Sequence, residues 1–235
     1  MKADLHIHTT FSDGLSSPKE VVSAAIKKGI NCICVTDHNE IKGAIEAMRF
    51  AFDKDILVIP GIEVTTKSGH ILGINVKKEI KKGLSPEKTI EEIRKQGGVA
   101  VIAHPFDWPT RSFRGGEKKI LSFGSENVGI EAFNAGAIVK SSNSRALKFA
   151  RKHNFIITAG SDAHEAKFIG RGYLELPDVV KSEEDLTQSL KNNLGEPKGE
   201  PYNWKELLRL AKEVKVSSGE LYNFIKNVFA FKKYK

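Results

Sequence analysis

The most informative stretch of this sequence is D-L-H-I-H-T-T-F-S-D-G, residues 4–14. Polar and apolar residues alternate from Asp4 to His8, which is the two-residue period of a β-strand. His6 and His8 therefore project from the same face of that strand. A purely structural face would be apolar at these positions, so the pair of imidazoles favours a metal site.

Strand and helix signals alternate along the rest of the chain. Residues 17–20 form a capping box with Pro18 at the first helical position, and Gly29 ends that helix. Apolar residues recur at helical spacing through residues 40–52. The other expected helices lie at 86–94 and 144–152. The expected strands lie at 2–7, 32–36, 55–59, 99–103, 130–133, 156–159 and 173–176, with an extra strand at 70–76 that pairs locally.

Seven strands joined mostly by helices predict a parallel α/β fold. An open doubly wound sheet and a barrel both satisfy the pattern, but no G-x-G-x-x-G or P-loop sequence follows the first strand. We therefore expect a seven-stranded TIM-like (β/α) barrel over residues 1–180. Helical signals at 183–192, 204–214 and 218–229, separated by the Gly/Pro-rich residues 195–201, predict a helical appendage over residues 181–235 that packs on the barrel.

Composition and charge narrow the class of protein. The 235 residues are 40% hydrophobic and 28% charged, which is ordinary for a globular chain and excludes collagen-like and disordered ones. No apolar run reaches the length of a membrane span. The polar N-terminus leaves no room for a signal peptide, and Cys32 and Cys34 are expected to be free thiols, so we expect a cytoplasmic protein without membrane partners. The net charge of +8 is spread along the chain and fits an anionic substrate or loose nucleic-acid association.

Six of the seven histidines lie in or just after predicted strands. They share those strand ends with four carboxylates, and in a parallel barrel the strand ends converge on one mouth. Imidazole nitrogen and carboxylate oxygen together suit Zn, Mn or Fe, and the number of groups exceeds the needs of one ion. We therefore expect a polynuclear site built from these residues: His6, His8, His38, His70, His104, His164, Asp13, Asp37, Glu63 and Asp162.

Each of these signals has an ordinary structural reading when it stands alone. A single buried histidine is more often a hydrogen-bonded core residue than a ligand. Asp37 and His38 could cap a helix, and Glu63 could be a solvated turn residue. His153 lies near a helix end among cationic residues, where a structural role is expected. The coincidence of six histidines at the same end of one predicted barrel favours the metal site.

A family resemblance joins these blocks. The sequences D-L-H-I-H-T-T-F-S-D-G (4–14), V-T-D-H (35–38), P-G-I-E-V (60–64), G-H-I-L-G (69–73), A-H-P (103–105) and G-S-D-A-H (160–164) occur in this order. Together they resemble the signature blocks of the PHP (polymerase and histidinol phosphatase) family of metal-dependent phosphoesterases. The match spans residues 3–164, and I-E-A-F-N at 130–134 resembles the smaller stand-alone members.

The resemblance implies a distorted seven-stranded barrel that holds two to three divalent ions. It places His6, His8, Glu63 and Asp162 around a first ion, and Glu63 would bridge to a second ion completed by His70 and His104. Asp13, His38 and His164 would hold a third. The implied reaction is hydrolysis of a small phosphate ester, such as a nucleotide or nucleoside bisphosphate, by a metal-bridging hydroxide, with Glu63 and Asp162 as catalytic residues.

Two other functions stay open at this point. A nuclease acting on DNA or RNA ends is the alternative enzyme, since the net charge of +8 permits it. A catalytically silent barrel that serves as a binding module is the third, but such a barrel would be expected to lack ligands. Every position that the resemblance assigns to a ligand is filled by a suitable residue.

Cations and orienting residues complete the predicted site. Arg171, in I-G-R-G, is the first candidate to contact the substrate phosphate, because a guanidinium can donate two hydrogen bonds to it. Arg111 and Arg114, in the loop after His104, are second candidates. Asp37 and Glu131 are candidates to fix imidazole tautomers from outside the ligand set.

Overall fold

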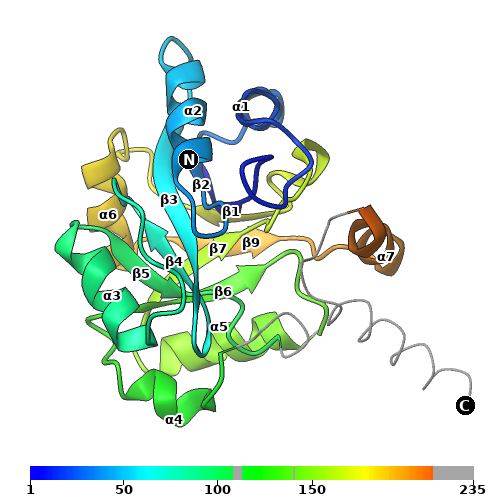
Figure 1. The fold of residues 1–235 in the computed structure, drawn as a ribbon. Coiled ribbons are helices and arrows are strands. Elements are labelled where there is room, and N and C mark those ends of the chain that lie inside the picture. The colour runs from blue at the N-terminus through cyan, green and yellow to red at the C-terminus, as the bar shows by residue number, and fades with distance from the viewer. Residues whose placement is uncertain (108–112, 140, 214–235) are drawn as a thin grey trace, which may run out of the picture.

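The computed structural model describes residues 1–107, 113–139 and 141–213. Within them, strands form one curled sheet with helices packed around it (Figure 1). The first half of the chain contains β1 (Lys2–Ile7), α1 (Pro18–Lys27), β2 (Cys32–Val35), α2 (Lys42–Ala51), β3 (Leu57–Thr66), β4 (Gly69–Ile74), α3 (Pro86–Lys95), β5 (Val99–Ile102) and α4 (Gly116–Leu121). The second half contains β6 (Gly129–Asn134), α5 (Ser142–Lys152), β7 (Ile156–Gly160), the 3₁₀ helix η2 (Ala166–Phe168), β8 (Gly172–Glu175), α6 (Glu183–Lys191), β9 (Glu196–Gly199) and α7 (Trp204–Glu213).

Local sequence sets the helix starts. The Ser17 side chain accepts a hydrogen bond from the backbone N–H of Glu20, and the Glu20 carboxylate accepts one from the backbone N–H of Ser17, so the expected capping box of α1 is present. The Ser85 side chain caps α3 by accepting from the Lys88 backbone N–H, and Pro86 is the first helical residue. These caps pair N–H groups that the first helical turn leaves without intrahelical partners.

The sheet closes where the end of β7 meets β1. Its strand order is β7-β6-β5-β4-β3-β2-β1-β8-β9. The Asp162 N–H donates to the His6 carbonyl oxygen at 2.9 Å, and the His8 N–H donates to the Ala163 carbonyl oxygen at 2.9 Å. These bonds join the two ends of the run β1–β7 and complete a barrel-shaped wall. Residues that follow β1 and residues that follow β7 are therefore neighbours.

A bulge in β1 determines that His6 faces the inside of the barrel. Asp4 pairs with Ile33 and Ile7 with Val35, so β1 uses one more residue than β2 over this interval. Leu5 packs inside the barrel, whereas Ile7 packs outside it beneath α1 and α2. The extra residue lets His6 as well as Leu5 face inward, which is the usual effect of a β-bulge on side-chain direction.

The apolar core has an inner part and two outer parts. The inner cluster joins side chains from strands on opposite walls, and Leu186 and Leu190 of α6 belong to it. Cys32 and Cys34 are buried free thiols in this cluster. The outer clusters lie between the sheet and its helices, one beneath α3 and α5 and the other beneath α1 and α2. The buried polar side chains of the site therefore gather at one end of the barrel, apart from these three apolar clusters.

The α/β barrel expected from the sequence is confirmed, but the strand number and directions differ. The described residues form nine strands rather than seven. β4 pairs antiparallel with both β3 and β5, so the strand at 70–76 belongs to the barrel wall. β8 pairs antiparallel with β1, and β9 pairs antiparallel with β8. Sequence period does not report strand direction, and a β3–β4 hairpin interrupts the parallel order.

The C-terminal part differs from a purely helical appendage. β9 lies inside residues 195–201, which the sequence analysis interpreted as a separator between helices. Its backbone extends the sheet through β8, and α6 contributes to the inner cluster. The helix expected at 218–229 lies outside the described residues. None of the described helices is both long enough and apolar enough to span a membrane.

We expect Gly160→Ala to destabilise the closure between β7 and β1. A Cβ atom on Gly160 would lie 2.3 Å from the His6 Cβ atom and 2.8 Å from the His6 backbone nitrogen. Such overpacking against fixed atoms should lower the free energy of unfolding by about 3 kcal/mol, measured by urea denaturation.

Gly83→Ala is the control for this substitution. Gly83 has a φ of +79°, and nothing lies within 4 Å of its added Cβ atom. The Gly83→Ala substitution should lower the free energy of unfolding by about 1 kcal/mol, because alanine is disfavoured in the left-handed backbone conformation of this position. Equal losses at the two positions would contradict a close contact at the closure.

Candidate metal centre

Nine acidic and imidazole side chains meet at one end of the barrel. They come from six strands or from the segments that follow these strands. The pairing of the strands in the barrel places all of these positions at the same mouth. His6, Glu63 and His70 lie in β1, β3 and β4, respectively. His8, Asp13, His38, His104, Asp162 and His164 lie just beyond strand ends. The structure thus brings together the nine residues that the family resemblance assigned to metal ligands, whereas Asp37, which the strand-end pattern had added to them, binds Thr9 and Ser12 instead.

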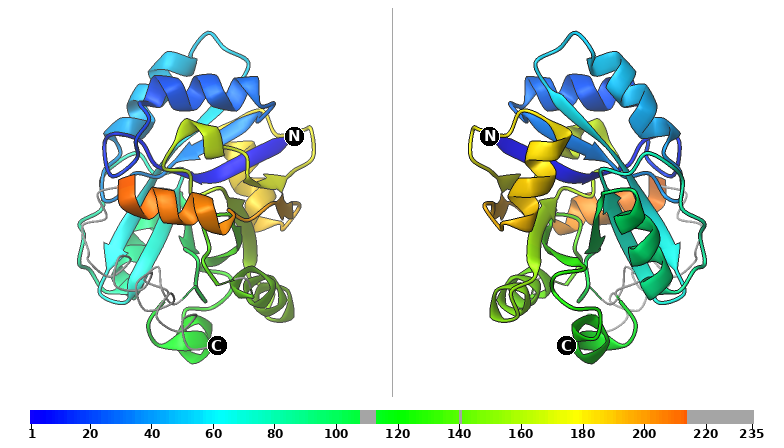
Figure 2. Two further views of the ribbon diagram at one scale, coloured as in Figure 1. Left: turned by 90° about the vertical axis from the view of Figure 1, so that its right-hand side faces the viewer. Right: turned by 90° about the vertical axis from the view of Figure 1, so that its left-hand side faces the viewer.

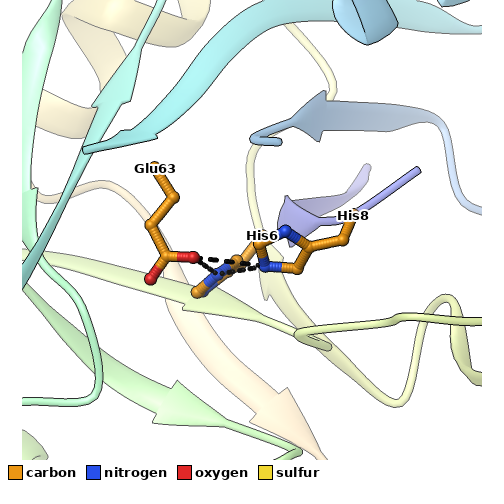
Figure 3. A group of neighbouring side chains, drawn as sticks. All are labelled: His6, His8 and Glu63. Atoms are coloured by element: carbon orange, nitrogen blue, oxygen red, sulfur yellow. Dashed lines mark hydrogen bonds and ion pairs between the residues drawn. The ribbon is translucent and has the colours of Figure 1, made fainter. Parts of the chain in front are cut away.

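The Glu63 carboxylate lies at the centre of this cluster. Its Oε2 atom is 3.4 Å from His6 Nε2, 3.3 Å from His8 Nε2 and 3.1 Å from His38 Nδ1. Its Oε1 atom is 2.9 Å from His70 Nδ1 and 3.4 Å from His104 Nε2. Figure 3 shows His6 and His8 with their imidazoles turned toward one oxygen of Glu63. The two oxygens of one buried carboxylate therefore face two different sets of imidazoles.

Two further carboxylates complete the cluster. Asp162 Oδ1 lies 3.5 Å from His6 Nε2 and 3.3 Å from His8 Nε2. Asp13 lies 3.6 Å from both His8 Nδ1 and His38 Nε2. It also lies 3.4 Å from His164 Nε2. Asp13 thus adds His164 to the cluster and shares His8 and His38 with Glu63.

A second layer orients the ligands. His6 Nδ1 lies 2.8 Å from Glu131 Oε1, which fixes the proton on Nδ1 and leaves the Nε2 lone pair for the cluster. Glu131 Oε2 accepts from the His104 backbone N–H at 2.7 Å. The Asn134 amide donates to Glu131 at 3.0 Å and to Asp162 Oδ2 at 3.1 Å. The tautomer-fixing contact expected of Glu131 is present.

The cluster fits divalent cations because several of its buried polar atoms approach one another without forming a well-directed hydrogen bond. His8 Nδ1, His38 Nδ1, Glu63 Oε1 and both ring nitrogens of His70 are buried without a hydrogen bond. Buried polar groups are normally paired, so this concentration calls for a ligand. His6 Nε2 and His8 Nε2 lie 3.1 Å apart. Four groups of three residues have ligand atoms within 4.8 Å of one another, and imidazole with carboxylate is a donor set for Zn, Mn or Fe.

The electrostatics are those of a mutually compensated cluster. Burial alone would raise the pKa of Glu63, but His70, His38 and His6 hold it well below the usual value. Burial alone would lower the pKa of His8, but Asp162 and Glu63 raise it to about 10. Burial, helped by the nearby His8 and His70, lowers the pKa of His38 to about 4. The carboxylates are therefore ionised at neutral pH, as ligands to cations must be.

Other candidates from the sequence lie elsewhere. Arg171 donates to the carbonyl oxygens of Glu200 and Pro201 and pairs with Glu206, so its guanidinium is engaged with the C-terminal segment. Arg114 is exposed, and its backbone N–H donates to Ser68. Arg111 lies outside the described residues. His153 follows α5 with its ring against Phe149, away from the cluster.

Asp37 has a different task from the one expected. Its carboxylate accepts from the Thr9 backbone, the Thr9 hydroxyl and the Ser12 hydroxyl, each at 2.7 Å. It therefore orders the loop that carries Asp13 rather than an imidazole ring. Gly43 of α2 leaves room for it, because a Cβ atom there would lie 2.0 Å from Asp37 Oδ2.

Sequence reasoning missed the orienting role of Asn134. This residue ends β6, where the register shifts between Glu131 and Phe133 and brings residues 131 and 134 to the same side. The sequence contained it in I-E-A-F-N, but the strand period gave no sign that a bulge would turn it inward.

Comparison with known proteins covers the same residues. A family model described as the PHP domain matches residues 4–122, and one described as PHP-associated matches residues 140–193. An uncharacterised protein of Methanocaldococcus jannaschii is 38% identical over 146 residues, which are 57% of this chain and 82% of that protein. The two matched segments contain all nine clustered side chains.

Some relatives carry named activities. The 3′,5′-nucleoside bisphosphate phosphatase of Chromobacterium violaceum is 32% identical over 46% of this chain and 42% of its own length. The 5′-3′ exoribonuclease of Haemophilus influenzae is 35% identical over 43% of this chain and 38% of its own length. This chain thus spans less than half the length of either enzyme.

A solved structure shares the fold. A two-domain protein of Bacteroides vulgatus, described as containing a predicted PHP-like metal-dependent phosphoesterase, superposes with a TM-score of 0.72 at 21% identity. The match covers 91% of this chain and 69% of that one. At this level of identity the likeness shows the barrel fold alone.

We expect divalent cations to bind more tightly as the pH rises from about 6 to about 9. His8 has a pKa of about 10 without metal, so it is protonated at neutral pH and must lose its proton to become a ligand. Each proton displaced should strengthen binding roughly tenfold per pH unit. Titration calorimetry with Mn²⁺ in two buffers of different ionisation enthalpy measures the protons released.

His8→Gln provides the control, since it removes one titrating ligand. It should release fewer protons than the wild type and show a shallower pH dependence. Binding of Mn²⁺ that does not change with pH would contradict the charge state that we assign to His8.

Proposed function

The chain belongs to the PHP family, as its sequence blocks indicated, and from this premise we propose that it is a metal-dependent phosphoesterase that acts on a small phosphate ester. The enzyme class agrees with its named relatives, which are hydrolases of phosphoester bonds. The observation that carries the proposal is the Glu63 carboxylate, whose two oxygens face separate sets of imidazoles. A carboxylate in that position is suited to bridge two cations.

We assign the ligands in three sets, of which the first two share Glu63. His6, His8, Glu63 and Asp162 would hold the first ion. Glu63, His70 and His104 would hold the second, and Asp13, His38 and His164 the third. When bound, two or three ions of Mn, Zn or Fe would lower the pKa of a coordinated water and neutralise charge on the phosphoryl oxygens. Asp13 lies closest to His164 and Glu63 Oε1 closest to His70, which supports the second and third sets. His38 stands between the sets, 3.1 Å from Glu63 and 3.6 Å from Asp13.

The chain's own residues supply position and exclusion of water. Glu131 holds His6 with its Nε2 atom free, and Asn134 holds one oxygen of Asp162 so that the other faces the imidazoles. The side chains of His6, His8 and Glu63 are at most 2% exposed. Their geometry is therefore fixed before substrate arrives, which lowers the reorganisation needed in the transition state.

A small phosphate ester is the substrate class that the chain favours. The relative named as a 3′,5′-nucleoside bisphosphate phosphatase supports it, and the excess positive charge is spread along the chain rather than gathered in a basic arm. A nuclease is the second candidate, and the relative named as a 5′-3′ exoribonuclease favours it. The two candidates share the same ligand set and differ in the length of the bound substrate.

We expect hydrolysis of para-nitrophenyl phosphate to require Mn²⁺ and to stop when the metal is chelated. Glu63→Gln should lower kcat/KM at least about 100-fold, because the amide replaces one of the two oxygens that face the imidazole sets. Release of para-nitrophenol measures the rate. Glu175→Gln, at an exposed position on β8, should keep wild-type activity. Equal activity in the Glu63 and Glu175 variants would defeat the proposal.

A substrate panel separates the two candidates. We expect phosphate release from nucleoside monophosphates or 3′,5′-bisphosphates to exceed cleavage of a 20-nucleotide RNA in kcat/KM. The rates on the small substrates should change little between 50 and 200 mM salt, because they do not displace the many counterions that a polynucleotide does. Faster cleavage of the RNA, with a steep loss of affinity in salt, would favour the nuclease.

A further inference from the structure

The loop that carries Asp162 has an unusual backbone. Asp162 has a φ of +53°, in the left-handed region that non-glycine residues adopt at a cost. Its Oδ1 atom faces His6 and His8, and its Oδ2 atom accepts from the Asn134 amide. The backbone on either side must be held firmly for this aspartate to keep that direction, because such a conformation persists where its surroundings fix it.

Tyr202 provides such a hold from the C-terminal segment. Its hydroxyl donates to the Ser161 carbonyl oxygen at 2.6 Å, and its backbone N–H donates to the Ala135 carbonyl oxygen at 2.8 Å. Ser161 directly precedes Asp162, and Ala135 directly follows Asn134. One residue therefore bonds to both chain segments whose side chains meet at Asp162 Oδ2. Tyr202 is 5% exposed, so water is poorly placed to replace its hydroxyl.

The Tyr202 ring is itself fixed by neighbours from the same loop. The Phe168 ring lies 4.4 Å away between centroids, and the Arg171 guanidinium lies 5.7 Å from the ring centroid. Arg171 also donates to the carbonyl oxygens of Pro201 at 2.8 Å and Glu200 at 3.2 Å. It thus grips the backbone immediately before Tyr202. The guanidinium proposed from sequence as a phosphate contact is placed here as a clamp.

α7 extends the same contact. Arg209 pairs with Glu165, which follows His164, and Glu206 pairs with Arg171. Figure 2 shows α7 beside the segment that contains η2. Residues 200–210, which we call the strap, thus lie across the loop at 161–171. The strap lies outside both segments that the family models match.

We propose that Tyr202 is a positioning residue for the Asp162 carboxylate, and that Arg171 serves the strap rather than the substrate. This inference rests on the proposed function, in which Asp162 is a metal ligand. Tyr202 acts through the Ser161 carbonyl and does not touch the reacting atoms. Its loss should therefore change how tightly the first ion is held more than it changes substrate recognition.

The test uses Tyr202→Phe in the full chain. This variant keeps the ring and its contact with Phe168 but removes the donor to Ser161. We expect Mn²⁺ to bind roughly tenfold more weakly, measured by titration calorimetry without substrate, since orienting partners of metal ligands have effects of this size. The KM for para-nitrophenyl phosphate at saturating Mn²⁺ should stay within twofold of wild type, and added Mn²⁺ should restore kcat.

Tyr173→Phe is the matched control. Tyr173 lies on β8, and the Lys2 ammonium nitrogen is 5.1 Å from the centroid of its ring. We expect the Tyr173→Phe variant to bind Mn²⁺ with wild-type affinity. Circular dichroism and urea denaturation of all variants show whether any loss of binding follows from unfolding. A change in affinity that parallels the unfolded fraction in Tyr202→Phe would overturn the proposal.

Arg171→Lys separates the clamp from a phosphate contact. A lysine keeps the charge but cannot reach both carbonyl oxygens with one planar group. We expect weaker Mn²⁺ binding with unchanged KM. A raised KM with unchanged Mn²⁺ affinity would instead return Arg171 to the substrate and overturn its place in the strap.

The outcomes distinguish this inference from the proposed function. Wild-type affinity for Mn²⁺ in folded Tyr202→Phe would overturn the positioning role and leave the metal site intact. Absence of Mn²⁺ binding by the wild type, with the chain folded, would overturn the proposed function and this inference with it.

Discussion

The buried Glu63 carboxylate is the constraint on which the arrangement of this protein depends. An isolated carboxylate at this depth would be strongly disfavoured, because burial removes its hydration. Five imidazole nitrogens lie within 3.4 Å of its two oxygens and offset that cost. Those imidazoles come from four other strands or the segments after them, so no local segment could build the group. A barrel mouth meets the requirement, since it brings many strand ends to one place.

Irregular backbone conformations direct the side chains of the cluster toward one another. The bulge in β1 lets Leu5 and His6 both face inward, and the register shift in β6 places Glu131 and Asn134 together. His104 and Asp162 have φ values of +31° and +53° just after their strands. Backbone strain of this kind costs of order 1–3 kcal/mol per residue and persists where neighbours fix it. Glu131 fixes the backbone at residue 104, and the β1–β7 bonds fix it at residue 162.

The C-terminal segment links the barrel to this irregular backbone. β9 pairs with β8 and so extends the sheet by one strand. Tyr202 comes shortly after β9, and its hydroxyl donates a hydrogen bond to the Ser161 carbonyl oxygen. The same segment supplies the partners of Arg171, namely Glu200, Pro201 and Glu206, which the sequence could not reveal. The sequence analysis expected this guanidinium at the site because it follows the G-S-D-A-H block closely, but Arg171 directly precedes β8 and its side chain contacts the C-terminal segment instead.

The sequence alone determined the chemistry of the cluster and the class of fold. Residue type and strand-end position marked ten side chains, Asp37 among them, and the family resemblance reduced these to nine ligands. Such signals exist in the sequence because ligand chemistry is carried by the residue itself and strand period by its immediate neighbours. Tertiary structure decided what these signals cannot carry. It set the direction of β4, β8 and β9, the inward turn of Asn134, and the partners of Asp37 and Arg171. Each of these depends on which distant segment lies opposite a residue, and that is settled by how the barrel closes rather than by any pattern along the chain.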